Sequence, residues 1–227
     1  MSRVARTITA RAPARPRGIA VRPTRDALRT KASILAAATH EFARHGLSGA
    51  RVDRIAERAR TNKRMLYYYF GGKEALFLAV LERAYEHIRA EEQHLHLLEL
   101  APARGVKQLI VFTWNYFLAH PEFMSLLNTE NLHRARHLKQ SKKVRAMHSP
   151  LVATLDELLK RGVRKGVFRR GVDPVQLYVS IAALGYFYLS NNHTLSTIFG
   201  RNLLAPAAKE ERIAHAVAFT LGYLKRK

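Results

Sequence analysis

Apolar side chains recur at three- and four-residue spacing along most of this chain, which is the pattern of amphipathic α-helices. The first such segment runs from about Thr24 to Arg44, and Gly46 follows where helices commonly end. Its apolar positions are Leu28, Ile34, Leu35, Ala38 and Phe42. No stretch alternates between apolar and polar residues as a half-buried strand does. The pattern therefore predicts an all-α protein.

Proline and glycine divide the rest of the chain into further helical segments. These helices are expected at residues 52–59, 63–70, 73–98, 104–119, 122–134, 141–163, 174–191 and 206–224. The segment 174–191 is apolar on nearly all sides, so it should be covered on two of them. Its continuously apolar part is 16 residues long, which is shorter than the ~20 residues of a membrane-spanning helix. No membrane partner is expected.

The same apolar segment and the amphipathic segment 206–224 are expected to form a two-fold interface between two copies of the chain. A stripe of large apolar side chains on each helix supports this expectation. The predicted interface residues are Leu177, Ile181, Leu184, Tyr188, Ile213, Val217 and Leu221.

The net charge of the chain indicates what kind of partner it binds. Among 227 residues, Lys and Arg number 39 against 17 Asp and Glu, which gives a formal net charge of +22. Such an excess favours a polyanionic partner. The first 75 residues hold 17 of the basic and 5 of the acidic side chains, so they are the expected contact region. Apolar residues reach 48%, enough for a folded core, and no cysteine is present for disulfides or thiolate chemistry.

Residues 1–23 are rich in Arg, Pro and Ala and lack an apolar period, which predicts a disordered basic arm. Arg15, Arg17 and Arg22 can enter a DNA minor groove or follow phosphates. A solvated tail that adds only non-specific affinity is an equal alternative. No apolar run typical of a secretory signal occurs here, so a cytoplasmic location is expected.

Two short helices, 52–59 and 63–70, are joined by about three residues, as in a helix-turn-helix. Thr61 or Asn62 can cap the second helix. Lys63 and Arg64 then lie at its N-terminal end, where cations are unfavourable unless an external anion such as DNA is present. Arg64 can bond guanine through two hydrogen bonds, while Asn62 can pair with adenine or act as the cap.

The remaining side chains of this second helix also fit DNA. Met65 can touch a thymine methyl group, and the hydroxyls of Tyr67 and Tyr69 can reach phosphate. Tyr68 and Phe70 are expected to help bury the helix instead. Arg51, at the start of the preceding helix, faces water and is a further candidate contact.

The stretch RIAERARTNKRMLYYYFGGKEAL, residues 54–76, resembles the helix-turn-helix signature of the TetR (tetracycline-repressor-like) family of bacterial regulators. The resemblance implies that the first half of the second helix reads base edges and that Tyr67, Tyr69 and Lys73 touch phosphate. Two positions depart from the family pattern. Arg60 stands where the family usually has Gly, and Ala50-Arg51 stands where a Ser or Thr cap is usual.

The resemblance also implies an organisation: an arm at 1–23, a helix-turn-helix domain at 24–72, and an effector-binding and dimerisation region at 73–227. It implies a homodimeric repressor that binds a palindromic double-stranded operator and is released by a small molecule. An architectural, ligand-independent DNA-binding protein is the main alternative. An enzyme is disfavoured because no nucleotide-binding, HExxH or GxSxG motif occurs, and no cofactor is expected.

An effector site is expected among aromatic residues of the C-terminal region, although aromatic residues at helical spacing more often form core. The candidate residues are Trp114, Asn115, Phe117, His120, Phe123, Asn128, Arg134 and Tyr186. The C-terminal segments LAHPEF and GVFRRGVDPVQLY resemble the TetR subgroup of pyrimidine-utilisation and nicotinate-catabolism repressors. The positive charge of this region favours an anionic aromatic or nucleobase-like effector.

Glu130, His133 and His137 share one helical face and could hold a metal ion. No second ligand cluster with suitable spacing accompanies them. A solvated or pocket-lining role is therefore favoured, and no metal site is predicted.

Overall fold

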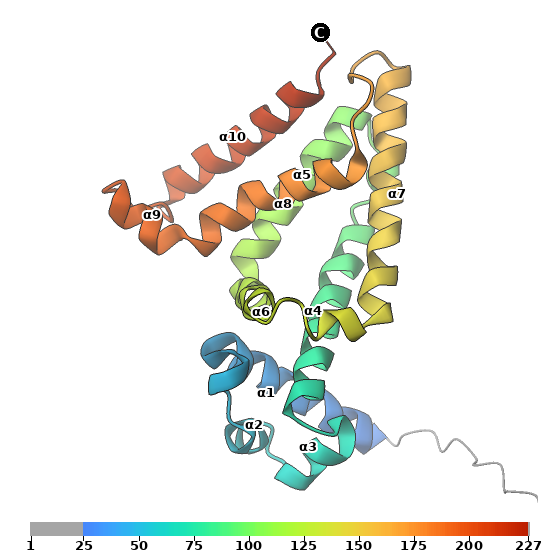
Figure 1. Cartoon of the computed structure of the whole chain (residues 1–227). Coiled ribbons are helices and arrows are strands. Elements are labelled where there is room, and N and C mark those ends of the chain that lie inside the picture. Colours follow the sequence, from blue (N-terminus) through green and yellow to red (C-terminus); the bar gives the residue numbers. More distant parts are fainter. Residues whose placement is uncertain (1–24, 227) are drawn as a thin grey trace, which may run out of the picture.

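The computed structural model describes residues 25–226, which form helices throughout (Figure 1). The bounds are α1 (Arg25–Gly49), α2 (Val52–Arg58), α3 (Lys63–Phe70), α4 (Lys73–Gln93), η1 (Leu97–Glu99), α5 (Pro102–Ala119), α6 (Pro121–Leu132), η2 (Leu138–Gln140), α7 (Lys142–Arg164), α8 (Pro174–Ser190), α9 (Asn192–Ile198) and α10 (Pro206–Leu224). Within these residues the extended structure is limited to an isolated bridge between Phe168 and Lys225. The all-α prediction is confirmed.

Helices α1 to α3 and the start of α4 form a small head at one end of the molecule (Figure 1). Its core is built by fully buried side chains such as Phe42, Ile55, Leu66 and Phe77, and the Phe42 and Phe77 rings meet edge to face. Leu126 of α6 belongs to the same buried cluster. The head is therefore packed directly against the C-terminal bundle.

The bundle is formed by α4, α5, α7, α8 and α10. The apolar faces of α5, α7, α8 and α10 share a second core. Leu109, Leu155, Leu158 and Leu224 are completely buried in it. A third, aromatic cluster lies between α4, α5, α6 and α8. None of the described helices is long and apolar enough to cross a membrane.

Two sequence predictions about helix ends are wrong. The helix expected at 73–98 ends at Gln93, because His96 adopts a left-handed backbone with φ 45° and residues 97–99 form a short 3₁₀ turn. Leu95 and Leu98 continue the apolar spacing past this break, so the pattern alone does not reveal it. The short helix α9 was not expected either, because it lacks an apolar stripe long enough to be recognised.

The predicted dimer residues lie mainly in the core of the protomer. Leu177, Ile181 and Tyr188 are less than a tenth exposed, and the remaining four are half-buried against the same clusters. The apolar stripe of α8 faces α5 and α7, and the apolar stripe of α10 faces α5 and α8, so both stripes are core faces. The large apolar side chains exposed on these two helices are Val175, Val179, Phe187, Phe219 and Tyr223.

Candidate nucleic-acid interface and effector cavity

The turn between α2 and α3 has the geometry that a helix-turn-helix needs. Arg60 adopts a left-handed backbone with φ 51°, although an L-residue there costs on the order of 1 kcal/mol. Asn62 caps α3, because its side-chain oxygen accepts a hydrogen bond from the Arg64 amide at 2.8 Å. Of the two roles predicted for Asn62, the structure therefore gives it the capping role.

Lys63 forms an ion pair with a carboxylate of the protein itself. Its ammonium lies 2.8 Å from the carboxylate of Asp53 on α2, and this hydrogen bond raises the pKa of Lys63 and lowers the pKa of Asp53. The expectation that Lys63 needs an external anion is thus wrong in this respect. The pair ties the first turn of α3 to α2, and both side chains are exposed enough to exchange this contact for another.

The outward face of α3 carries Arg64, Tyr67 and Tyr68. Arg64 is exposed, and 46% of Tyr67 and 79% of Tyr68 are exposed. Successive residues turn by about 100° around a helix, so buried Leu66 directs Met65, Tyr69 and Phe70 toward the core. The prediction that Tyr68 helps bury the helix is therefore wrong.

Helix α2 starts without a side-chain cap from its own first residues. Instead the buried carboxylate of Glu41 on α1 accepts a hydrogen bond from the Arg51 amide at 3.1 Å. This contact explains how the chain tolerates Ala50-Arg51 at the usual position of a Ser or Thr cap. The Arg51 side chain remains exposed.

Lys73, at the start of α4, is also engaged. Its ammonium donates hydrogen bonds to the carbonyls of Ser48 at 3.4 Å and Ala50 at 3.1 Å. These contacts fix α4 to the segment before α2, and the phosphate contact of Lys73 stays a prediction. Arg15, Arg17 and Arg22 of the predicted arm lie outside the described residues.

The predicted effector residues do not form one cavity. Trp114, Phe117 and Phe123 are buried in the aromatic cluster, while Asn115 and Arg134 are exposed. The other three predicted residues have polar contacts within the protein. His120 lies beside Glu122. Asn128 forms a hydrogen bond with Ser190, and the hydroxyl of half-buried Tyr186 contacts Asn128. His120 and Phe123 do line a cavity of about 300 Å³ between α1, α4 and the α5–α6 turn.

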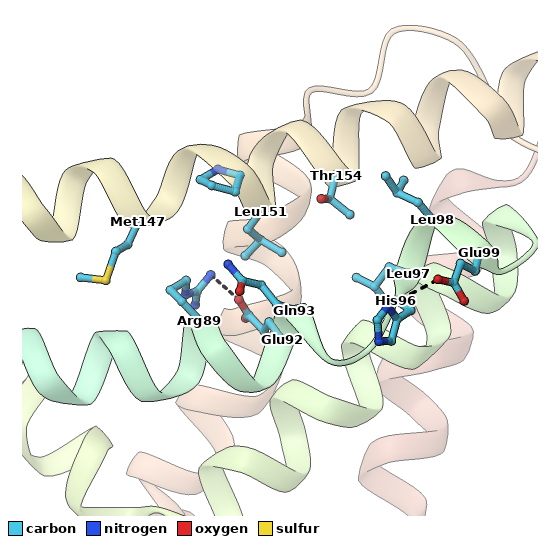
Figure 2. Close-up of a pocket in the computed structure, with 11 residues that line it drawn as sticks. Arg89, Glu92, Gln93, His96, Leu97, Leu98, Glu99, Met147, Leu151 and Thr154 are labelled. Carbon is cyan, nitrogen blue, oxygen red and sulfur yellow. Dashed lines mark ion pairs between the residues drawn. The ribbon is translucent and has the colours of Figure 1, made fainter.

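A different cavity, of about 270 Å³, lies between the end of α4, η1 and α7 (Figure 2). Its walls are largely apolar, with Leu97, Leu98, Met147, Pro150 and Leu151 among the lining residues. No pattern in the sequence indicates this cavity. Its residues are up to 65 positions apart in the chain, and only the packing of α7 against α4 brings them together.

Arg89 and Glu92 of α4 lie at this cavity, and both are about 95% buried. Arg89 Nη1 is 2.7 Å from Glu92 Oε2, and Arg89 Nη2 donates a hydrogen bond to the Tyr178 hydroxyl of α8 at 3.1 Å. The ion pair is not aligned as a hydrogen bond, so Arg89 Nε, Arg89 Nη1 and Glu92 Oε2 lack hydrogen-bond partners among the described residues. Burial outweighs the attraction of Arg89 and raises the pKa of Glu92 to about 7.

A second buried polar cluster lies where the head meets the bundle. The ring of His137 contacts Glu130 through Nδ1 and Glu74 through Nε2, each at 2.6 Å. Glu130 also accepts hydrogen bonds from the amides of His137 and Leu138, both at 2.9 Å. The solvated or pocket-lining role favoured for His137 is therefore wrong, because its side chain is only 3% exposed.

A helix-turn-helix with exposed Arg and Tyr side chains, joined to a helical bundle that contains a cavity, defines the class of DNA-binding transcriptional regulators. Two family models match the chain. Residues 34–80 match bacterial regulatory proteins of the tetR family, and residues 102–219 match the tetracyclin repressor-like C-terminal domain. The chain belongs to the TetR family of transcriptional regulators.

Individual relatives agree with this assignment. The chain is 38% identical to the HTH-type transcriptional repressor NicS of Pseudomonas putida, over 87% of this chain and 93% of NicS. It is 29% identical to the regulator RutR of Escherichia coli K12, over 76% of this chain and 80% of RutR. These relatives match the subgroup that the C-terminal segments resemble. A crystal structure of SCO4942 from Streptomyces coelicolor superposes with a TM-score of 0.65 at 28% identity, covering 87% of this chain and 99% of that chain.

Proposed function

We propose that this regulator is a cytoplasmic homodimer that represses transcription by binding a palindromic operator and that a small effector releases it. The observation that carries the proposal is the outward face of α3, where Arg64, Tyr67 and Tyr68 are exposed at the end of the molecule. Two such helices about 34 to 36 Å apart would enter successive major grooves of one DNA face. The predicted arm would add contacts to a minor groove or to phosphates.

Arg64 is assigned to base reading, because its guanidinium follows the capped N-terminus of α3 and has room to reach a guanine edge. Tyr67 is assigned to phosphate, and Tyr68 joins it because its side chain is the more exposed one. Arg51 is a further phosphate contact at the start of α2. Lys63 is assigned a dual role, in which Asp53 holds it until a phosphate replaces the carboxylate.

Paired titrations on operator DNA and random DNA test this assignment. Arg64→Ala should lower operator affinity by about 1 to 3 kcal/mol and leave affinity for random DNA nearly unchanged. Arg145→Ala, an exposed site on α7, is the control for loss of one positive charge. Equal losses on both DNAs would remove Arg64 as a base reader and favour the architectural alternative.

The homodimer is supported by the exposed apolar side chains of α8 and α10. Val179 and Phe187 of α8 and Phe219 of α10 are each more than half exposed, which is unusual unless another surface covers them. A second copy of the chain can cover this face in a two-fold arrangement. Phe187→Glu should shift sedimentation toward the monomer and weaken operator binding. Leu132→Glu on α6, where the leucine is 84% exposed, should leave the dimer intact.

Effector release is supported by the path of α4. Two residues separate the end of α3 from the start of this helix, and its last turn lies at the cavity of the bundle. A ligand that changes the packing of α4 against α7 can therefore change the position of α3. The basic character of the bundle favours an anionic aromatic or nucleobase-like compound, and operator release in a ligand screen tests this class.

A further inference from the structure

The buried Arg89–Glu92 pair has the features of an incomplete binding site. Removing two charges from water is unfavourable unless hydrogen bonds satisfy their remaining polar atoms. Here the ion pair and the Tyr178 hydroxyl leave Arg89 Nε and Nη1 without hydrogen bonds among the described residues. The same pair lies at the wall of a cavity. The chain thus keeps an unsatisfied guanidinium beside an internal space.

The shape of this space limits its occupant. A cavity of about 270 Å³ is just below the usual range for small-molecule sites, about 300 to 1,000 Å³, so it favours a small ligand. Figure 2 shows Arg89 and Glu92 of α4 below and Leu151 of α7 above them, with Met147 farther along α7. A ligand would place an apolar body along α7 and a polar end at α4.

The charges that line the cavity determine which polar group a ligand can place there. A guanidinium can donate hydrogen bonds to a carboxylate. Arg89 Nε lacks a hydrogen-bond partner among the described residues, while Arg89 Nη1 lies in the ion pair with Glu92. Glu92 and Glu99 line the same pocket and would repel a phosphate with two negative charges more strongly than a carboxylate with one, and besides Arg89 the only basic lining residue is His96. A single negative charge matches the single guanidinium better.

We propose that the cavity between α4 and α7 binds a small monocarboxylic acid with an apolar body, whose carboxylate is held by Arg89. This inference rests on the proposed function, because the cavity would be the effector site of the repressor. Glu92, whose Oε2 lies 2.7 Å from Arg89 Nη1, then borders the same polar end and can form a hydrogen bond with the ligand there. The high pKa of Glu92 allows it to take up a proton when a second carboxylate enters.

Isothermal titration calorimetry of the full chain with benzoate tests the proposal, with benzamide as the matched neutral probe. Benzoate should bind about 10- to 100-fold more tightly than benzamide, as expected for a charge-assisted hydrogen bond. Equal affinities for the two probes, or no heat from either, would overturn the proposal. Operator binding measured on the same preparation shows separately whether the DNA-binding function stands.

Substitutions in the cavity test whether benzoate binds there. Arg89→Met combined with Glu92→Leu removes both charges without leaving either one unpaired, and it should abolish the preference for benzoate. Met147→Trp fills the cavity without changing a charge and should also prevent binding. Arg83→Gln is the matched control on α4, because Arg83 lines the other cavity. Loss of benzoate binding in Arg83→Gln, with binding retained in the double variant, would overturn the assignment.

Discussion

Helix α4 carries charged groups into two buried sites, and the two sites differ in how completely their polar atoms are partnered. At its first turn, Glu74 joins His137 and Glu130, and both ring nitrogens of His137 contact carboxylate oxygens. At its last turn, Arg89 and Glu92 contact each other, and three of their polar atoms have no hydrogen bond among the described residues. A saturated cluster stabilises one arrangement of the protein, whereas an unsaturated one is suited to a ligand.

The saturated cluster joins three segments of the chain. Both ring nitrogens of His137 lie 2.6 Å from carboxylate oxygens, one of Glu130 and one of Glu74. Because Glu74 belongs to the helix that follows the recognition helix and Glu130 belongs to α6, the cluster fixes the head to the bundle.

The largest effect is expected at this junction. His137→Leu should lower the free energy of unfolding by about 3 kcal/mol, the lower end for breaking a buried charge pair, because Glu130 keeps its two backbone donors. Urea denaturation at one fixed protein concentration measures it, since the stability of a dimer depends on concentration. His133→Leu is the control, because His133 contacts only the Thr129 carbonyl of its own helix among the contacts resolved for its ring nitrogens. Equal losses of unfolding free energy in His137→Leu and His133→Leu would show that the contacts of His137 with the two carboxylates add no stability.

The opposite result is expected at the cavity. Replacing both Arg89 and Glu92, as Met and Leu, should leave the free energy of unfolding unchanged or raise it by about 1 to 4 kcal/mol, since an incompletely bonded buried pair stabilises less than apolar packing. Arg89→Met alone should destabilise the protein, because it leaves Glu92 unpaired. Marked destabilisation by the double variant would show that the pair is structural, and the comparison between the two sites would fail.

Stability should change with pH in opposite directions at the two sites. Burial raises the pKa of Glu92 to about 7, so the folded state binds its proton more tightly, and stability should fall as pH rises from about 4.5 to 7. The shift corresponds to about 3 kcal/mol. The hydrogen bond with His137 lowers the pKa of Glu74, so its contribution is present at neutral pH and is lost as pH falls below about 4.5.

Single substitutions separate the two slopes. Glu92→Gln should remove most of the fall in stability between pH 5 and pH 8, and Glu74→Gln should reduce the loss at acid pH. Urea midpoints measured from about pH 3 to about pH 8 provide the readout for both variants. A stability curve that keeps its shape in Glu92→Gln would contradict the effect of burial assigned to that carboxyl.

Local chemistry made the head of this protein predictable from its sequence. Leu66 and the apolar residues around it define α3, and Asn62 is a good cap for any helix that starts at Lys63. The orientation of Tyr68 was predicted incorrectly, because three adjacent tyrosines offer no clear periodicity and only the burial of Leu66 sets the phase. The left-handed turn at Arg60 was anticipated only as a departure from the family pattern.

The bundle was predictable as a set of helices but not as a site. Glu130 and His137 share a helical face in the sequence, yet their third partner, Glu74, is 63 residues from His137. The cavity depends in the same way on α7 packing against α4. On α8, apolar residues such as Ile181 mark the core, so a hydrophobic stripe cannot distinguish a core face from an interface.

The smallest effect is expected at Arg60, where the backbone rather than a side chain is unfavourable. Its φ of 51° is readily adopted by glycine. Arg60→Gly should raise the free energy of unfolding by about 0.5 kcal/mol, because relief of roughly 1 kcal/mol of strain is partly offset by the greater freedom of glycine in the unfolded chain. Arg60→Ala removes the same charge but keeps the strain, so it should give no gain. If both variants gain equally, repulsion between charges explains the effect, and the turn is not a strained element retained for DNA binding.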